Sequence, residues 1–594
     1  MQRPHDELYR APPNLFRMWR LLIEFLWRIE HAFERSRNRN RAVDDTRVRI
    51  FGVLLLFAML FVGLAAKASA VALLNHVEIG VEGPTAAIHR ADLVDRNGEM
   101  LALDVPHYGV YVDGRDTWTA KETKDGLLSV LTRAPAAGLA SKIDEAVSGK
   151  RIVLIQSGLT AQERDQVHDL GLPGVTFQEE PRRAYPLDHQ ASHLIGFSDP
   201  AGKGLAGAEK ALDADLHSAA AGGGHIALAM DLRIQAALEA ELKRAVDLYG
   251  AQNAIGLVTN VQTGEVLALA NLPDYDPNHP GEGDPAAQIN RAGAFRYEMG
   301  STFKMFTFAM ALNEHVARLD TVLDTLHPLQ MGSRTVHDSH PAGKNLTMEE
   351  VFLESSNIGT ARLARMAGID RLHAYLQNFG VLDRAKIELA ESVKPLAPAE
   401  WNEDSGVSVS FGHNIAVTPL AVAQGVGGLT NGGRLLPLTI RKRDGADLPA
   451  GPQVITPETS QVLLQLLRKN VTDGTGRNAE KEAPGYRMGG KTGTAEKVIN
   501  GQYARKRLFT SFAAVFPTDG PLNAPRYLVL VLLDEPKPTA ASSGNAQAAW
   551  NAGPTAGRVV NRIAPLLNVK RDLTQVAVRT VDKPLVEDVS TDAQ

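Results

Sequence analysis

The sequence of 594 residues contains no cysteine. Disulfide bonds, thiolate nucleophiles and cysteine-ligated zinc or iron–sulfur centres are therefore excluded. The chain also lacks an excess of positive charge, because 63 lysines and arginines stand against 68 aspartates and glutamates. Nucleic-acid-binding proteins usually carry a clear basic excess, so we predict no nucleic-acid partner.

Long uncharged runs made mostly of large apolar residues are also scarce, and one lies near the N-terminus. Residues 50–66 carry no charged side chain, and Lys67 ends the run. A helix needs about 20 mostly apolar residues to cross a bilayer. We predict a single transmembrane anchor at residues 50–67, and the alternative is a helix buried in a protein core.

The residues before this run indicate how the chain is oriented in the membrane. Six arginines lie close to its start, namely Arg35, Arg37, Arg39, Arg41, Arg47 and Arg49. The positive-inside rule places residues 1–49 in the cytoplasm and the chain after Lys67 on the outer side of the membrane. Residues 68–70 (Ala-Ser-Ala) resemble a signal-peptidase site, so cleavage there is the alternative to an uncleaved anchor.

The predicted cytoplasmic tail has apolar residues at helical spacing between Leu15 and Phe33. This pattern predicts an amphipathic helix that lies on the inner leaflet or docks a partner helix. The alternative is a tail without stable structure.

Composition divides the rest of the chain into two larger regions and a tail. We predict an elongated non-catalytic pedestal domain, rich in short strands, at residues 68–224, with a hairpin turn at Asn97-Gly98. The triplet Gly222-Gly223-Gly224 marks its end. Residues 225–568 have strand-like segments at both ends and helical patterns between them, which predicts an α/β domain around one sheet. Residues 569–594 are polar and form a predicted C-terminal tail.

The second region contains a first candidate motif, Ser301-Thr302-Phe303-Lys304, followed by an apolar stretch that suits a buried helix. Positions i and i+3 of a helix share a face, so Ser301 Oγ and Lys304 Nζ can meet near the helix N-terminus. Alone this motif is weak evidence, because a chain of this length contains about one or two such spacings by chance.

Two further motifs follow in the same region. Ser355-Ser356-Asn357 by itself is usually a turn or a helix cap. Lys491-Thr492-Gly493-Thr494 comes directly after two glycines, which indicates a strand whose backbone is closely approached by another segment. The alternative is an edge strand made permissive by glycine. The three motifs in this order are much stronger evidence for a catalytic site than any one of them alone.

Together they resemble the penicillin-recognising serine acyltransferases. Further segments narrow the resemblance to class B penicillin-binding proteins, and within these to the division-type (FtsI-like) transpeptidases. These segments lie at residues 90–98, 183–186, 204–209, 263–268, 275–278, 418–420, 474–476 and 510–512. The resemblance runs from about residue 47 to residue 566.

The resemblance implies a transpeptidase domain, an antiparallel sheet flanked by helices, behind the pedestal domain and the transmembrane helix. It implies an enzyme that cross-links peptidoglycan stem peptides through an acyl-serine intermediate during septal wall synthesis. Such an enzyme needs no metal and no cofactor, and it is a target of β-lactams. Its implied partners are a division-complex glycosyltransferase and small bitopic division proteins.

The motif residues suit this chemistry. Ser301 is the predicted nucleophile, and Lys304 is the predicted base, because burial and the nearby charge of Lys491 lower the pKa of a lysine. Ser355 is predicted to relay a proton to the leaving amine. Asn357 is predicted to hold the substrate amide.

The remaining candidates are expected to bind the substrate's terminal carboxylate. They are Thr492, Gly493 and Thr494, acting with Lys491. By resemblance, the main-chain N–H groups of Ser301 and Thr494 form the oxyanion hole.

The chain departs from the family pattern at three positions. Met299 stands where the family commonly has proline, and Ala91 replaces a usual glycine. Asn414 ends the segment Phe411-Gly412-His413-Asn414, where glycine is usual, and asparagine tolerates a left-handed backbone better than most residues. None of the three removes a catalytic group.

Four other functions stay open from the sequence. A serine β-lactamase shares the three motifs but is usually shorter, and a D,D-carboxypeptidase performs the same first half-reaction. An elongation-type transpeptidase would act on the lateral wall. A scaffold of the division complex, with dispensable catalysis, is the alternative from another class of protein.

Overall fold

The computed structural model describes residues 52–65, 89–331, 334–443, 450–499 and 501–572, and the single residues Arg28, Lys67 and Thr574. Residues 1–85 and 86–594 form two separate compact units. In the first unit, residues 52–65 are helical. Among the described residues, no helix has both the length and the apolar character that a membrane crossing requires. The predicted amphipathic helix of the tail lies, apart from Arg28, outside the described residues.

The second unit begins with the predicted hairpin, formed by β1 (Asp92–Val94) and β2 (Met100–Val105). Gly98 has φ +93°, a left-handed conformation that glycine adopts without steric cost. Two further strands complete a four-stranded sheet in the order β6-β2-β1-β7, with β6 at Arg182–Ala184 and β7 at His225–Ala227. Strand β7 directly follows the glycine triplet and runs parallel to β1.

A buried cluster of charged side chains joins three of the segments that resemble class B penicillin-binding proteins, at residues 90–98, 183–186 and 204–209. Arg90 Nε donates to Glu209 Oε2 at 2.9 Å, and Arg183 Nε donates to Glu209 Oε1 at 2.7 Å. Arg183 also reaches Asp104 Oδ1 at 3.1 Å. The Glu209 side chain is fully buried, so it needs both cationic partners to offset its desolvation.

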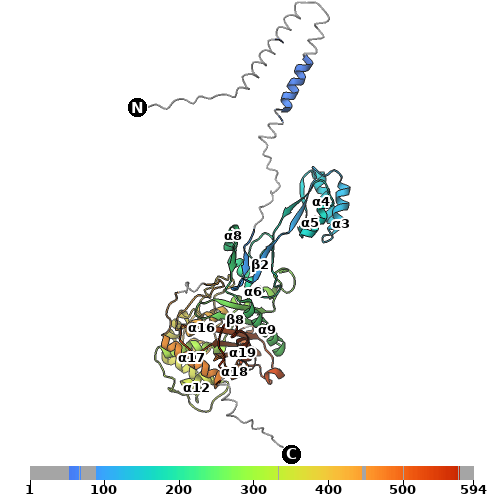
Figure 1. Cartoon of the computed structure of the whole chain (residues 1–594). Helices are drawn as coiled ribbons and strands as arrows, with labels where there is room; N and C mark the ends of the chain where they lie inside the picture. Colours follow the sequence, from blue (N-terminus) through green and yellow to red (C-terminus); the bar gives the residue numbers. More distant parts are fainter. Residues whose placement is uncertain are drawn as a thin grey trace, which may run out of the picture. The chain divides into compact units, whose positions relative to one another are not determined.

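Between these strands lies a smaller α/β lobe with its own core. Its sheet has the order β4-β3-β5, with β3 at Tyr108–Asp113, β4 at Ile152–Leu159 and β5 at Val175–Glu179. Three helices pack on it (Figure 1), namely α3 (Ala120–Val130), α4 (Ala136–Gly149) and α5 (Ala161–His168). The prediction of a strand-rich pedestal therefore needs correction, because buried Leu139, Ile143 and Ala146 recur at helical spacing and form a helix core.

The larger domain is built around one antiparallel sheet of five strands in the order β14-β15-β16-β8-β9. The strands are β8 (Asn253–Asn260), β9 (Val266–Leu272), β14 (Gly489–Ile499), β15 (Gln502–Phe516) and β16 (Tyr527–Asp534). Strands from both ends of the region thus pair in one sheet, which confirms the predicted antiparallel sheet flanked by helices. Strand β14, which carries the Lys-Thr-Gly motif, lies at its edge.

Both faces of the sheet are covered. Along β16, Leu528, Leu530 and Leu532 belong to one core cluster, and the alternate residues Val529, Val531 and Leu533 belong to another. Because successive strand side chains point to opposite faces, a strand buried on both faces reads as a continuous apolar run. Helices α9 (Leu232–Tyr249) and α19 (Ala552–Ile563) cover one face, and α11 (Lys304–Asn313) and α16 (Pro419–Thr430) belong to the cluster on the other.

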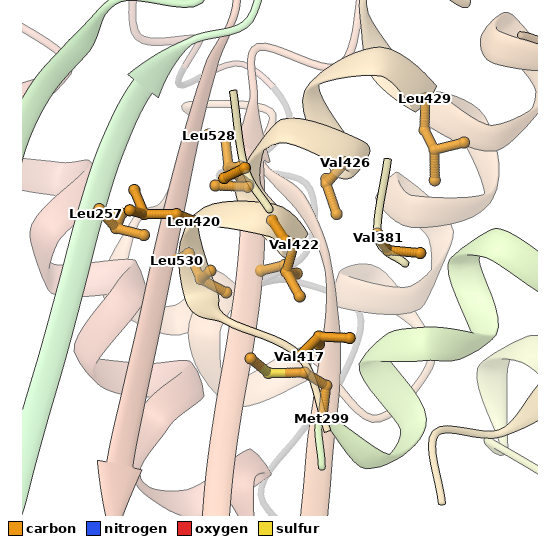
Figure 2. Close-up of a cluster of buried hydrophobic side chains, with 14 of the residues drawn as sticks. Leu257, Met299, Val381, Val417, Leu420, Val422, Val426, Leu429, Leu528 and Leu530 are labelled. Carbon is orange, nitrogen blue, oxygen red and sulfur yellow. The ribbon is translucent and has the colours of Figure 1, made fainter. Parts of the chain in front are cut away.

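The core on the α16 side reaches the residue next to the Ser301 turn. Figure 2 shows Leu420, Val422 and Val426 of α16 packed beside Leu528 and Leu530, with Met299 and Val417 at the end of the same cluster. Tyr297 and Val417 also exchange two main-chain hydrogen bonds, at 2.9 and 3.0 Å. The core therefore anchors the segment that leads into Ser301, and Met299 is fully buried in it.

The remaining elements are short connections and the helical part of the large domain. Before the domain lie α6 (Ser192–Ile195), α7 (Gly207–Ala211) and α8 (Asp213–Ala221). Within it lie η1 (Pro285–Gln288), α10 (Arg291–Ala294), η2 (Gly300–Phe303), β10 (Val322–Leu323), β11 (Leu329–Met331), β12 (Arg334–Val336), β13 (Leu346–Thr347), α12 (Met348–Leu353), α13 (Asn357–Ala367), α14 (Ile369–Asn378), α15 (Glu403–Ser410), α17 (Pro457–Thr472), α18 (Arg477–Glu482), η3 (Ala540–Ser542) and η4 (Ala548–Trp550). After α19, Asp572 N donates to Gly485 O at 2.8 Å, so residues 569–572 lie on this domain.

Candidate active site

The structure brings the three motifs to one cavity of about 450 Å³. Ser301 lies in the 3₁₀ turn η2, directly before α11, and Lys304 is the first residue of that helix. Ser355 lies between α12 and α13 in a left-handed conformation, with φ +58°. The third motif lies on β14. Five of the predicted residues line the cavity, namely Ser301, Ser355, Asn357, Thr492 and Thr494.

Two glycines let the Ser301 turn touch the edge strand. A Cβ at Gly493 would lie 2.2 Å from Met299 O, and one at Gly300 would lie 2.6 Å from Thr494 O. Gly300 also has φ +51°, which favours glycine. The close backbone approach predicted for β14 is therefore confirmed, and it sets Ser301 beside Thr494. Strand β14 is also an edge strand of the sheet, which was the alternative prediction for the Lys-Thr-Gly motif.

Two lysines converge on the hydroxyl of Ser355. Lys491 Nζ donates to Ser355 Oγ at 2.9 Å, and Lys304 Nζ reaches the same oxygen at 3.2 Å. Lys304 also donates to the main-chain oxygen of Ser355. Both lysines have no exposed surface. The hydrogen bonds of Lys304 go to Ser355, and within the described residues none joins its Nζ to the Ser301 hydroxyl.

Burial changes the protonation of both amines. Burial lowers the pKa of Lys304 well below its usual value, and the charge of Lys491 lowers it further, whereas the charge of Asp338 raises it. Burial lowers the pKa of Lys491 to about 7. Both amines therefore lose their proton more easily than an exposed lysine does, which is the direction that the sequence predicted for Lys304.

The hydroxyls at the other side of the cavity are held in place by neighbours. Thr492 Oγ1 lies 2.9 Å from Thr475 Oγ1, which in turn donates to Asn470 Oδ1 at 3.3 Å. Thr494 Oγ1 accepts a hydrogen bond from Ala548 N at 3.1 Å. Because a hydroxyl both donates and accepts, the Thr494 proton remains available to a carboxylate.

Asp338 is a residue of the cavity that sequence reasoning missed. Its carboxylate accepts hydrogen bonds from Ser356 Oγ at 2.6 Å and from the main-chain N–H groups of Asn357 and Ile358, the latter at 3.0 Å. It thus caps α13 and fixes Asn357, together with Ser356, whose Oγ accepts from Gly359 N at 3.0 Å. Asp338 lies 18 residues before Ser356, so no local pattern connects the two.

His413 is a second residue that was not predicted for the site. Its ring lines the cavity, and its Nδ1 is buried with no hydrogen-bond partner among the described residues. Burial lowers the pKa of His413, and the charge of Lys304 lowers it further, so both favour the neutral ring. The next residue, Asn414, has φ +60°, which confirms the left-handed turn expected from asparagine at that position.

Comparison with known proteins agrees with this geometry. The family model of the penicillin-binding protein transpeptidase domain matches residues 254–553, and that of the penicillin-binding protein dimerisation domain matches residues 85–220. The probable peptidoglycan D,D-transpeptidase FtsI of Caulobacter vibrioides is 48% identical over 573 residues, which cover 95% of this chain and 96% of that protein. Peptidoglycan D,D-transpeptidase FtsI of Escherichia coli K12 is 28% identical over 83% of this chain and 86% of its own length.

A solved structure is similar as well. Penicillin-binding protein 3 of Mycobacterium tuberculosis, complexed with aztreonam, superposes with a TM-score of 0.62 at 25% identity, covering 82% of this chain and 98% of that one. The sheet, the serine–lysine turn and the edge-strand lysine are those of an acyl-serine enzyme. The chain belongs to the penicillin-binding protein family, in its class B group of a transpeptidase domain preceded by a dimerisation domain.

Proposed function

We propose that this penicillin-binding protein is a peptidoglycan D,D-transpeptidase that joins stem peptides through an acyl-Ser301 intermediate during septal wall synthesis. The single observation that carries the proposal is the pair of buried lysines that share the Ser355 hydroxyl beside Ser301. The long FtsI-type relative supports the septal assignment over the lateral wall.

In the first half-reaction, Ser301 Oγ attacks the carbonyl carbon of the penultimate D-alanine. The O–H proton passes to the free-base amine of Lys304, and a tetrahedral oxyanion forms. The C–N bond to the terminal D-alanine then breaks. Ser355 gives its hydroxyl proton to the departing nitrogen and regains one from Lys304, because its oxygen is within hydrogen-bonding distance of that amine.

In the second half-reaction, an amine from a neighbouring stem peptide attacks the acyl-enzyme carbonyl. Its proton returns along the same route, the Ser301 ester bond breaks, and an amide forms as the cross-link. Water in place of the amine would give a D,D-carboxypeptidase, which remains the nearest alternative activity. The relatives that support the transpeptidase assignment extend over almost the whole chain.

The negative charges of the reaction have matching donors. We assign the oxyanion to the main-chain N–H groups of Ser301 and Thr494, because the Gly300–Thr494 contact sets the two residues side by side. The substrate's terminal carboxylate is assigned to Lys491, Thr492 and Thr494, and Gly493 lets the strand approach the Ser301 turn. Asn357, held by Asp338, is assigned to the substrate amide.

The site of action follows from the N-terminal sequence. The uncharged run at 50–66 and the arginines before it support an inner-membrane anchor, with the catalytic domain in the periplasm. Within this proposal, residues 68–224 are the pedestal domain, residues 225–568 the transpeptidase domain and residues 569–594 the tail. A division-complex glycosyltransferase and small bitopic proteins are the proposed partners. Loss of about the first 70 residues from the mature protein, measured by mass spectrometry, would refute the anchor.

The test of the function is labelling of the purified protein by a fluorescent penicillin, followed over hours. We expect a stable adduct in the wild-type protein and none in Ser301→Ala, with an unchanged circular dichroism spectrum. Rapid release of the label would indicate a β-lactamase. A folded wild-type protein that takes up no label would favour the scaffold, as would full support of division by Ser301→Ala.

A further inference from the structure

The two threonines of the third motif differ in what their hydroxyl protons can do. Thr494 Oγ1 accepts a hydrogen bond from Ala548 N, so its own proton remains available to the catalytic cavity. Thr492 Oγ1 instead lies 2.9 Å from Thr475 Oγ1, and either oxygen can be the donor in this pair. The direction of that hydrogen bond therefore decides whether Thr492 can offer a proton to a substrate.

A fully buried asparagine fixes the direction. Asn470, on α17, donates from Nδ2 to Gly490 O at 2.7 Å, which leaves its Oδ1 as the atom next to Thr475. Thr475 Oγ1 donates to this Oδ1 at 3.3 Å. A hydroxyl has one proton, so Thr475 has none left for Thr492 and accepts the Thr492 proton instead. Before a substrate binds, the Thr492 proton thus points to Thr475 and away from the reacting groups.

The main chain holds Thr475 beside Thr492. Thr475 lies in the loop between α17 and α18, lines the catalytic cavity, and donates from its main-chain N–H to Leu353 O at 3.3 Å. The preceding residue, Gly474, has no room for a side chain, because a Cβ there would lie 2.5 Å from Asn470 Oδ1. The Thr475 hydroxyl can therefore rotate while its oxygen stays in place.

We propose that Thr475, oriented by Asn470, is a positioning residue that reserves the Thr492 proton for an anionic ligand. When a carboxylate binds, Thr492 rotates to donate to it, and Thr475 then donates to Thr492. Each hydroxyl keeps its own proton, and no covalent bond changes. The hydrogen bond that is lost is the one to Asn470, which at 3.3 Å is longer than usual for a hydroxyl donor.

This reversal favours a carboxylate over a neutral group. Hydrogen bonds to an ionised acceptor are about twice as strong as those between neutral groups, so a carboxylate offsets the loss at Asn470 and a carboxamide does so less well. The inference rests on the proposed transpeptidase function and deepens it, because it assigns part of the carboxylate selectivity to Thr475. Thr475 takes no part in bond making.

The test uses two N-benzoyl-D-alanyl thioesters and the full-length protein in detergent. The leaving group of the first is thioglycolate, which ends in a carboxylate, and in the second this carboxylate is replaced by a carboxamide. Thiol release in a single turnover, followed over a range of concentrations, gives a half-saturation constant and a limiting acylation rate. The ratio of the two half-saturation constants is the preference for the carboxylate.

Thr475→Val keeps the shape of the side chain without its hydroxyl. We expect it to lower the preference about tenfold, the size of one hydrogen bond, and to leave the limiting acylation rate unchanged. Thr475→Ser, which keeps the hydroxyl, should keep most of the preference. The matched control is Thr472→Val, because the Thr472 hydroxyl bonds outside the cavity, to Lys469 O at 3.1 Å and Asp473 Oδ2 at 2.8 Å.

Penicillin labelling of Ser301 reports whether each variant is folded. Thr475→Ala removes the same hydroxyl with less bulk and should lower the preference by the same factor, so the test does not depend on valine alone.

Three outcomes would overturn the assignment. The first is a wild-type protein that binds both thioesters equally well, a result that needs no variant. The second is a wild-type preference in labelled Thr475→Val or Thr475→Ala. The third is a lower limiting rate with an unchanged preference, which would assign the Thr475 hydroxyl to proton transfer or to the shape of the site. Absence of penicillin labelling in the wild-type protein would instead refute the proposed function itself.

Discussion

Lys491 Nζ on the edge strand donates a hydrogen bond of 2.9 Å to the hydroxyl of Ser355, which lies between α12 and α13. Lys304 reaches the same oxygen from the start of α11. One hydroxyl thus joins the three motifs and lies between two buried amines. This arrangement accounts for both the low pKa of Lys304 and a route for protons between the nucleophile and the leaving group.

The Ser355 hydroxyl should be needed for acylation. We expect Ser355→Gly to lower the acylation rate by about 10²- to 10⁴-fold, the usual contribution of a positioned proton-transfer group. Glycine is chosen because Ser355 has φ +58°, where alanine would add strain to the lost hydroxyl. Stopped-flow acylation by penicillin measures the rate. An unchanged rate in a variant of wild-type thermal stability would exclude the relay.

The pH dependence of acylation should show the titration of Lys491. Its pKa is about 7, so the amine is cationic below this pH and loses its charge above it. Binding of a substrate or penicillin carboxylate needs the cation, so kcat/KM for acylation should fall as the pH rises above about 7. In Lys491→Arg the charge persists to high pH, so this alkaline decrease should disappear even if the rate is lower. The same decrease in both proteins would contradict the assignment.

Asp338 should affect both the stability of the folded protein and the pKa of the proposed base, Lys304. Asp338→Asn removes a charge from the start of α13 and weakens three hydrogen bonds, and we expect it to lower the free energy of unfolding by about 1–2 kcal/mol. Asp338 raises the pKa of Lys304, so its neutralisation should move the acidic decrease of the acylation profile to lower pH. Asp320→Asn, at an exposed ion pair, is the control. A stable variant with an unshifted profile would refute the coupling.

The contact between the Ser301 turn and β14 should not tolerate a side chain at Gly493. A Cβ there would lie 2.4 Å from both Ser511 Oγ and Thr302 Oγ1, in addition to the contact with Met299 O. We expect Gly493→Ala to push the strand away from the turn and lower the acylation rate at least a hundredfold, roughly the loss of one oxyanion donor. The control is Gly427→Ala in α16, where a Cβ meets no other atom within 4 Å. Equal acylation by both variants would contradict the proposed geometry.

Much of the sheet was predictable from local patterns. The run of apolar residues at 527–533 indicates a strand, and the Thr263-Gly264 turn indicates a pair of strands on either side of it. The helices of the smaller lobe were not predicted, because short strand and turn patterns surround them in the sequence. The role of Asp338 was missed because its partners follow it by 18 to 20 residues.

A cavity of about 790 Å³ that shares Ala495, Glu496 and Tyr503 with the catalytic one could not be predicted, because its lining comes from distant segments. Arg291 and Glu298 precede Ser301, whereas Glu496 and Tyr503 follow the third motif. Neither charged residue before Ser301 belongs to a recognisable motif. Only the folded chain shows that one nitrogen of Arg291 and one oxygen of Glu298 lie buried without partners in the described structure.

The sequence by itself determined the identity of the reacting groups, because Ser-x-x-Lys, Ser-x-Asn and Lys-Thr-Gly specify a nucleophile, amines and an edge strand through spacing that is local. The tertiary structure decided their protonation and their contacts. Burial lowers the pKa of Lys304 and Lys491, and burial is produced by packing between elements far apart in the chain. Desolvation and close backbone approach depend on distances across the whole domain, and these distances exist only once the five-stranded sheet and its covering helices have formed.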